Sequence, residues 1–156
     1  MTYKKVLCVG LYDNGLSLLL KLLCKKKEAV KFVRSVGIDD HARKELSSSK
    51  SVIDIALELG FVIVYHKPIH PSITEDAKKS NLTVLYHQPT HISTIKNINL
   101  FDMIITPYRF VYDQLIGRRA MNAEKVHLIC HPDGIDIATS FAQAYPLLRS
   151  WVDSHL

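Results

Sequence analysis

The residues of this sequence that could carry chemistry are histidines and aspartates, and they gather where short apolar runs end. An imidazole near neutral pH can act as a general base, donate a hydrogen bond or bind a metal. Two segments are near repeats, Tyr-His-Lys-Pro-Ile-His at 65–70 and Tyr-His-Gln-Pro-Thr-His at 86–91. Five of the eight histidines follow apolar runs, namely His66, His70, His87, His91 and His131.

Metal binding is one interpretation of these histidines. Their i, i+4 spacing would suit a helix, but Pro68 and Pro89 disfavour a helical turn there, and no matching cluster of carboxylates accompanies them. We therefore predict no metal site. Two interpretations remain open: the rings cap the sheet where strands pass into loops, or one or two of them line a polar ligand site.

The first loop, at 10–15, reads Gly-Leu-Tyr-Asp-Asn-Gly. It lacks the third glycine of a dinucleotide fingerprint and the Lys-Ser/Thr of a nucleotide P-loop. It also lacks the Cys-x5-Arg of thiol phosphatases, because Asn14 stands six residues after Cys8. Gly15 precedes a predicted helix, whose first N–H groups could hold an anion or a hydroxyl. A simple tight turn is the alternative.

Short β-rich runs alternate with helical patterns along the whole chain. Such alternation predicts right-handed βαβ units. We expect an α/β fold, a single Rossmann-like domain over residues 1–156. Its doubly wound, mainly parallel sheet would have about six strands and helices on both faces, with ligands bound at the carboxyl ends of the strands. The predicted strands are 4–10, 29–36, 61–65, 82–86, 101–106 and 125–130, and the predicted helices are 16–27, 39–46, 51–59, 73–80, 108–116 and 137–154.

The composition places the chain among single-domain globular proteins. It has 156 residues, of which 47% are hydrophobic and 22% charged. The most apolar run, 16–24, has about half the length of a membrane helix, so we predict no membrane span and a cytoplasmic location. The three cysteines form no Cys-x-x-Cys pair, which indicates reduced core thiols.

Positive charge is concentrated in the first third of the chain. Residues 1–50 carry 11 Lys and Arg against 5 Asp and Glu, which allows a weak interaction with an anionic partner. The Lys25-Lys26-Lys27 run ends a predicted helix, where cations suit the helix dipole. No aromatic residues are interleaved with these lysines, so nucleic-acid binding is disfavoured.

The stretch FDMIITPYRFVYDQLIG at 101–117, followed by EKVHLICHPDGID at 124–136, resembles a part of GT-B-fold glycosyltransferases. The strands at 61–66 and 82–87 resemble further strands of that family. The likeness would cover the chain as the N-terminal, acceptor-side domain only. Two positions depart from the family pattern: Asp133 precedes Gly134 where Asn is usual, and Tyr108 replaces a Ser.

The resemblance implies a glycosyltransferase-like protein that binds a sugar acceptor or a nucleotide-sugar. The donor-binding second domain is missing, so activity would come from the chain alone, from a homodimer or with a donor-domain protein partner. The resemblance makes no cofactor certain and allows a nucleotide-sugar donor. The alternative is a noncatalytic nucleotide- or partner-binding module with the same fold.

The candidate site residues follow from this expectation and from the strand-end rule. A general base would deprotonate the acceptor hydroxyl, and the candidates for that catalytic role are His87, His66 and Asp13. The candidate ligand-binding residues are Gly10, Asn14, Gly15, His91, Arg109, His131 and Asp133.

Overall fold

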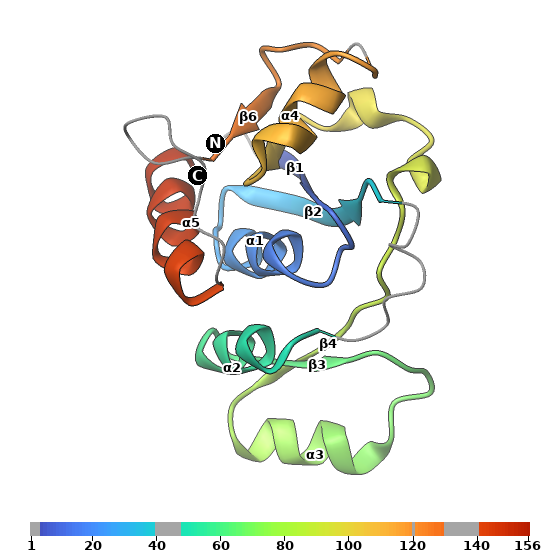
Figure 1. Cartoon of the computed structure of the whole chain (residues 1–156). Helices are drawn as coiled ribbons and strands as arrows, with labels where there is room; N and C mark the ends of the chain where they lie inside the picture. Colours follow the sequence, from blue (N-terminus) through green and yellow to red (C-terminus); the bar gives the residue numbers. More distant parts are fainter. Residues whose placement is uncertain (1–3, 40–47, 120, 130–140) are drawn as a thin grey trace.

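The computed structural model describes residues 4–39, 48–119, 121–129 and 141–156, with the side chains of 141 and 142 left out (Figure 1). It contains a four-stranded parallel sheet in the order β2-β1-β5-β6 and a separate parallel pair, β3-β4. The strands are β1 (Lys4–Gly10), β2 (Val30–Gly37), β3 (Phe61–Val64), β4 (Thr83–Tyr86), β5 (Met103–Thr106) and β6 (Val126–Leu128).

Helices cover both faces of the large sheet. One face carries α1, against which α5 and α2 pack, and its core includes Cys8, Leu19 and Leu148. The other face carries α4, and its core includes Val9 and Leu115. The helices are α1 (Leu16–Lys25), α2 (Lys50–Glu58), α3 (Pro71–Lys79), α4 (Arg109–Ile116) and α5 (Phe141–His155), with short 3-10 turns at η2 (Ile92–Thr94) and η3 (Ile98–Leu100).

The α/β class with a mainly parallel sheet is therefore confirmed, but a single sheet of about six strands is not. The strands β3 and β4 pair only with each other among the described residues, and they lie with α2 and α3 below α1 (Figure 1). Phe61 is buried, and the rest of β3 is only partly buried.

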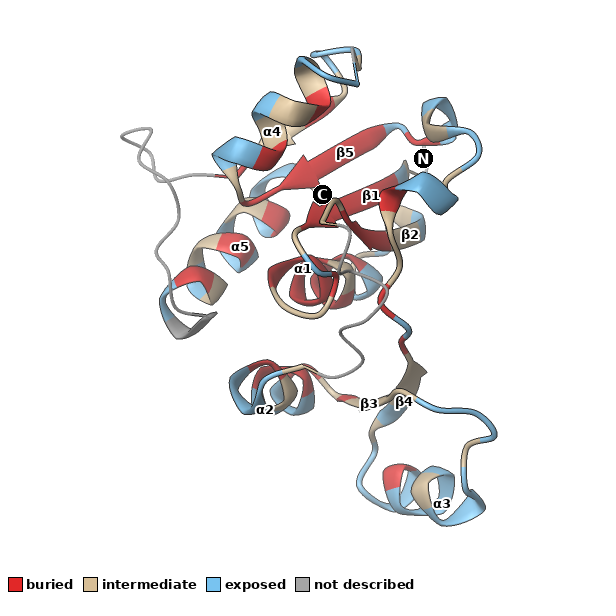
Figure 2. Ribbon diagram, turned by 45° about the vertical axis from the view of Figure 1, so that its right-hand side comes forward, coloured by how far each residue is buried: buried red, intermediate tan, exposed pale blue. Residues whose placement is uncertain are grey.

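Burial explains why α1 forms the centre of the molecule. Its side chains are apolar on almost every side, and eight of its ten residues are buried. Figure 2 shows β1, β5 and α1 in the buried colour and much of α3 exposed. Lys21 is the one position in the middle of α1 that carries a charge. No helix of the described segments is long and apolar enough to span a membrane.

The helices begin and end within a few residues of the predicted positions, and residues typical of helix ends stand there. Ser49 caps α2, and its Oγ accepts the N–H of Val52 at 3.4 Å. Gly60 follows α2 with φ +93°, the left-handed conformation expected of a glycine after a helix. The α5 helix continues through Pro146. The helix predicted at 39–46 falls almost entirely outside the described residues.

Candidate functional site

A buried group of polar side chains lies where β1, β2 and β4 end and α1 begins. We call it the Asp13 cluster. It joins the loop between β1 and α1, the first turns of α1, β2, and the segment that leads from β4 back to the large sheet. Its members are Asp13, Ser17, Lys21, Ser35, His87 and Thr90.

Asp13 is the centre of the cluster. Its backbone has φ +59°, a left-handed conformation that aspartate tolerates better than most residues. One carboxylate oxygen accepts the hydroxyl of Ser17 at 3.2 Å, and the other accepts the backbone N–H of Thr90 at 3.0 Å. Burial raises the pKa of Asp13 to about 6, although hydrogen bonds and the charge of Lys21 pull it down.

His87 bridges Lys21 and the Asp13 loop. Its Nε2 lies 2.5 Å from the backbone oxygen of Asp13, and because a carbonyl only accepts, Nε2 carries the proton. Nδ1 then accepts a hydrogen bond from Lys21 Nζ at 3.0 Å. Burial and the charge of Lys21 lower the pKa of His87 to about 4. The imidazole is thus neutral at pH 7, and its 3.8 Å approach to Asp13 Oδ2 is no ion pair.

Ser35 completes the cluster from β2. Its side chain is buried, and its hydroxyl has no hydrogen-bond partner among the described residues. It nevertheless lies close enough to the Asp13 carboxyl to lower the pKa of that group. The Ser35 hydroxyl is therefore a buried polar group next to the carboxylate, with no hydrogen bond to another described residue.

The loop between β1 and α1 borders a small cavity of about 190 Å³, lined by residues 11–17 and Tyr108. Gly10 lets β1 approach α1 closely, since a Cβ there would lie 2.9 Å from Ser17 Cβ and Oγ. No side chain caps the N-terminus of α1 at Gly15. Backbone N–H groups at the start of a helix, together with the helix dipole, favour an anion at this position.

Cys8 does not belong to this cavity. It is fully buried on the face of β1 that packs against α1. Burial and a hydrogen bond with Cys24 raise the pKa of the Cys8 thiol well above its ordinary value. A thiol in that state is not a nucleophile, and Asn14 supplies no positive charge to the loop.

The structure brings together five of the ten predicted site residues. Gly10, Asp13, Asn14 and Gly15 form the loop, and His87 contacts it. His66 lies exposed after β3, and no hydrogen bond or ion pair among the described residues joins it to the Asp13 cluster.

The remaining predicted residues are found at the start of α4, at the start of η2 or outside the description. Arg109 is exposed at the start of α4. His131 and Asp133 fall outside the described residues. Within those residues, no group of three or more metal-ligating side chains could hold a metal ion.

The near repeats have a structural role at their second histidines. His70 Nδ1 accepts the N–H of Ser72 at 3.1 Å and caps α3. His91 Nδ1 accepts the N–H of Ser93 at the same distance and caps η2, and its Nε2 reaches the backbone oxygen of Ile38 at 3.2 Å. These two histidines therefore cap helix N-termini, those of α3 and η2, rather than the sheet.

Sequence reasoning missed Ser17, Lys21, Ser35 and Thr90. A signal existed for the first two: Ser17 and Lys21 are four residues apart, which places them on one side of the helix, and Asp13 stands four residues before Ser17 in the loop that leads into it. A single lysine within an apolar helix was a further sign of a buried partner. Nothing in the sequence pointed to Ser35 or Thr90.

The fold can be compared with known proteins now that its site is described. No family model and no curated protein matches the chain. Solved structures match over nearly its whole length, and their fold is that of the low-molecular-weight protein tyrosine phosphatases. Wzb of Vibrio vulnificus, in complex with benzylphosphonate, has a TM-score of 0.63 at 18% identity, over 97% of this chain and 96% of that one.

Two further phosphatases give the same result. The tyrosine phosphatase AmsI of Erwinia amylovora has a TM-score of 0.65 at 13% identity, over 97% of this chain and 90% of its own. Wzb of Escherichia coli K30, in complex with sulphate, has a TM-score of 0.61 at 17% identity, over 98% and 99%. Identities this low establish the shared fold and nothing beyond it.

These matches overturn the resemblance to glycosyltransferases. Phosphatase structures of about this length account for the whole chain as one unit, so the chain is not matched as the acceptor-side half of a GT-B enzyme. The expected glycosyltransferase function is contradicted by these phosphatase matches, and the alternative of a noncatalytic nucleotide- or partner-binding module is not supported by them. The motifs that suggested the family are strand and turn patterns that many Rossmann-like sheets share.

Proposed function

We propose that this protein is a phosphatase of phosphate monoesters, and that the loop at 10–15 and the start of α1 hold the phosphate group. The observation that carries the proposal is the uncapped N-terminus of α1, which opens into the cavity beside Asn14 and Tyr108. Phosphate, sulphate and benzylphosphonate are bound by solved proteins of the same fold, which supports this class of ligand.

The catalytic group we assign is Asp13. Asp13 is one of the residues that line the cavity, and its buried carboxyl, with a pKa of about 6, is ionised at neutral pH yet basic enough to accept a proton. In the proposed step, a water molecule gives a proton to the Asp13 carboxylate while the water oxygen forms a bond to phosphorus. The ester P–O bond breaks, and the leaving oxygen takes a proton from solvent, so one alcohol and one inorganic phosphate are formed.

The remaining cluster members hold Asp13 in place. Ser17 and Thr90 each donate to one carboxylate oxygen, and His87 fixes the backbone of the same residue. We call these positioning residues, because none of them is assigned a contact with the phosphate. Lys21 and Ser35, whose hydroxyl has no hydrogen-bond partner among the described residues, are the further polar groups beside the carboxyl.

The proposed route does not use the thiol of Cys8. That thiol is buried against Cys24 with a raised pKa, and Asn14 offers no guanidinium for the developing charge. Arginine contributes strongly to transition-state stabilisation in phosphoryl transfer, so we expect turnover to be slow.

The test uses p-nitrophenyl phosphate with purified full-length protein and follows released phosphate by ³¹P NMR. The variants are Asp13→Asn, Cys8→Ser and, as a matched control, Asp54→Asn, which changes an exposed aspartate on α2. We expect Asp13→Asn to lower the rate about 100-fold or more, in the range typical of a lost general base. Cys8→Ser and Asp54→Asn should stay within about twofold of the parent.

Two other outcomes would overturn the proposal in part or in full. Loss of activity in Cys8→Ser with activity kept in Asp13→Asn would overturn the assignment of Asp13 and return the chemistry to the thiol. Absence of phosphate release from the parent protein would overturn the proposed function.

A further inference from the structure

A second and larger hollow lies on the face of the large sheet opposite α1. We call it the Phe32 groove. It has a volume of about 690 Å³ and is formed by β1, β2 and residues 94–101, which contain η3. Its apolar lining consists of Phe32, Ile95, Leu100 and Phe101. A volume in this range is typical of sites for small organic ligands.

The groove exists because this part of the sheet lacks a covering helix. β2 is the edge strand, and α4 packs over the β5 and β6 side. The two 3-10 turns cover the rest only partly. Phe32 is consequently 49% exposed and Leu100 60% exposed, whereas Phe101 beneath them is buried. Large apolar side chains that are exposed next to one another mark a ligand-binding groove or an interaction surface.

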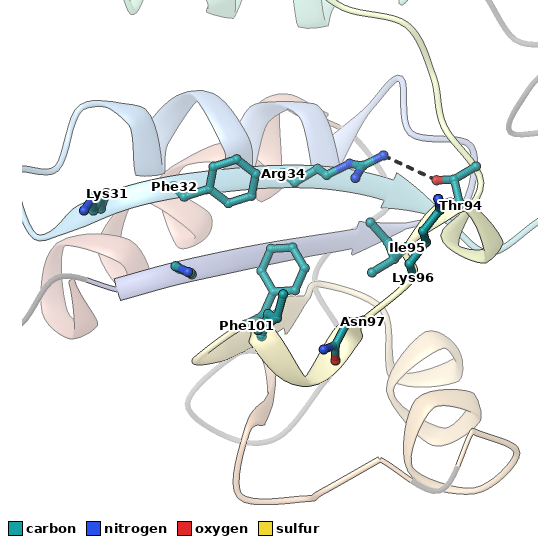
Figure 3. Close-up of a pocket in the computed structure, with 10 residues that line it drawn as sticks. Lys31, Phe32, Arg34, Thr94, Ile95, Lys96, Asn97 and Phe101 are labelled. Carbon is teal, nitrogen blue, oxygen red and sulfur yellow. Dashed lines mark hydrogen bonds between the residues drawn. The ribbon is translucent and has the colours of Figure 1, made fainter.

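Figure 3 shows the rings of Phe32 and Phe101 above β2 and β1. Their centroids are 6.1 Å apart and their planes are inclined by 35°. This spacing is within the range in which aromatic rings attract one another. The exposed ring of Phe32 leaves a face against which a further planar ring can pack.

The groove is also strongly positive. Four cations line it, namely Lys5, Lys31, Arg34 and Lys96, and no carboxylate is among its lining residues as the structure describes them. Arg34 is turned toward Thr94 Oγ1, at 3.4 Å, and is held beside the groove (Figure 3). The nearby carboxylate of Asp102 accepts the backbone N–H of Lys5 at 2.8 Å. Such a charge distribution attracts an anion.

We propose that the Phe32 groove is a binding site for a small planar aromatic carboxylate. The ring packs on Phe32 over Phe101, and the carboxylate pairs with the surrounding cations, above all Arg34, whose planar guanidinium matches a carboxylate. The site is distinct from the proposed phosphatase site. Phe32 and Lys5 lie near the amino ends of their strands, whereas the loop at 10–15 follows the carboxyl end of β1.

The probe for the test is 2-naphthoate, titrated into ¹⁵N-labelled full-length protein. We expect saturable binding with a dissociation constant of about 0.1–1 mM, as suits a ligand of this size. The shifted amide signals should be those of β2 and residues 94–101. The neutral isostere 2-naphthalenemethanol should bind at least about tenfold more weakly, because it lacks the charge. Decanoate should also bind more weakly, because it lacks the ring.

Two variants test the residues, each with a matched control. Phe32→Ala should weaken 2-naphthoate binding about tenfold, while Phe110→Ala, which changes a 51% exposed phenylalanine on α4, should leave it unchanged. Lys96→Glu should weaken binding about fivefold or more, and Lys79→Glu on α3 should not. Lys96 and Lys79 are exposed, and the rings of Phe32 and Phe110 are about half exposed, so the fold should tolerate all four changes.

Three results would overturn the proposal. The first is the absence of saturable shifts up to about 5 mM 2-naphthoate, well above the expected dissociation constant. The second is equal binding of the neutral alcohol or tighter binding of decanoate. The third is binding that Phe32→Ala leaves intact. Phosphate release from p-nitrophenyl phosphate should be the same in Phe32→Ala as in the parent, so failure here is separable from failure of the proposed function.

Discussion

His87 donates its Nε2 proton to the backbone oxygen of Asp13 at 2.5 Å, across 74 residues of sequence. The contact ties the segment leaving β4 to the loop before α1, and so connects the two sheets. Both side chains are buried, and burial moves their pKa values in opposite directions, since it disfavours a charged carboxylate and a charged imidazole alike.

The first prediction concerns how stability depends on pH. The folded-state pKa of Asp13 is raised to about 6, so the folded protein binds more protons than the unfolded one between about pH 4 and 6, and stability falls as pH rises. The folded-state pKa of His87 is lowered to about 4, so stability rises with pH between about 4 and 6.5. In the parent protein these two contributions should nearly cancel.

Single variants should expose each contribution. In Asp13→Asn only the histidine remains, and the free energy of unfolding should rise by about 3 kcal/mol between pH 4 and 6.5 relative to the parent's profile. In His87→Gln, whose amide can still donate to Asp13, it should fall by a similar amount. Urea unfolding at several pH values measures this. Parallel pH profiles for parent and variants would contradict the buried pair.

A second prediction concerns the state of the His87 ring. Nδ1 accepts from Lys21 and Nε2 donates to Asp13, so the imidazole should remain the neutral Nε2–H tautomer from about pH 5 to 8. Long-range ¹H–¹⁵N NMR of the ring nitrogens distinguishes this form from the other tautomer and from imidazolium. The ring nitrogen signals of the exposed His66 in the same spectrum serve as the internal control for those of His87. Observation of an Nδ1–H signal for His87 would show that the Lys21 contact is absent.

A third prediction follows from the proposed general base. Phosphate release should increase with pH as Asp13 loses its proton, through an apparent pKa of about 6, and then level off. The pH dependence of kcat for p-nitrophenyl phosphate measures it. Ser17→Ala removes one donor to the carboxylate, so it should move this apparent pKa upward. A rate that continues to rise well past pH 8 would point to a thiol instead.

A fourth prediction concerns Cys8. Because its thiol is buried against Cys24, iodoacetamide should modify Cys8 only when the protein unfolds, as measured by peptide mass mapping. Asn14→Arg would create Cys-x5-Arg, yet we expect it to leave Cys8 unreactive, because the arginine does not turn the thiol out of the core. Rapid alkylation of Cys8 in native Asn14→Arg would show that the loop rearranges readily.

A fifth prediction tests the close approach of β1 to α1. Gly10→Ala should cost about 1–3 kcal/mol of stability, because the new methyl group would meet Ser17 at 2.9 Å. Adding Ser17→Gly removes the obstructing atoms, so the double variant should be more stable than the sum of the single changes predicts. Chemical denaturation of the parent, the two single variants and the double variant gives the four free energies of unfolding that this double-mutant cycle needs. Strict additivity would mean that the contact with Ser17 is not what excludes a side chain at position 10.

Much of the local structure could be predicted from short-range patterns. The six strands and the helices α1 to α5 lie near the predicted ranges, because periodicity and helix-end residues act over a few positions. The helix predicted at 51–59 ends just before Gly60, and α2 ends one residue earlier, at Glu58. The loop at 10–15 was also correctly placed before a helix N-terminus.

The sequence by itself therefore determined the elements, their order and the residues of the first loop. Only the tertiary structure decided that β3 and β4 form their own sheet, and that Lys21, His87 and Asp13 meet. It also decided that Cys8 faces Cys24 rather than the loop. Periodicity fixes which face of an element is apolar, but the partner of that face depends on packing among segments far apart in the chain, and that packing sets burial and hence the pKa values at the site.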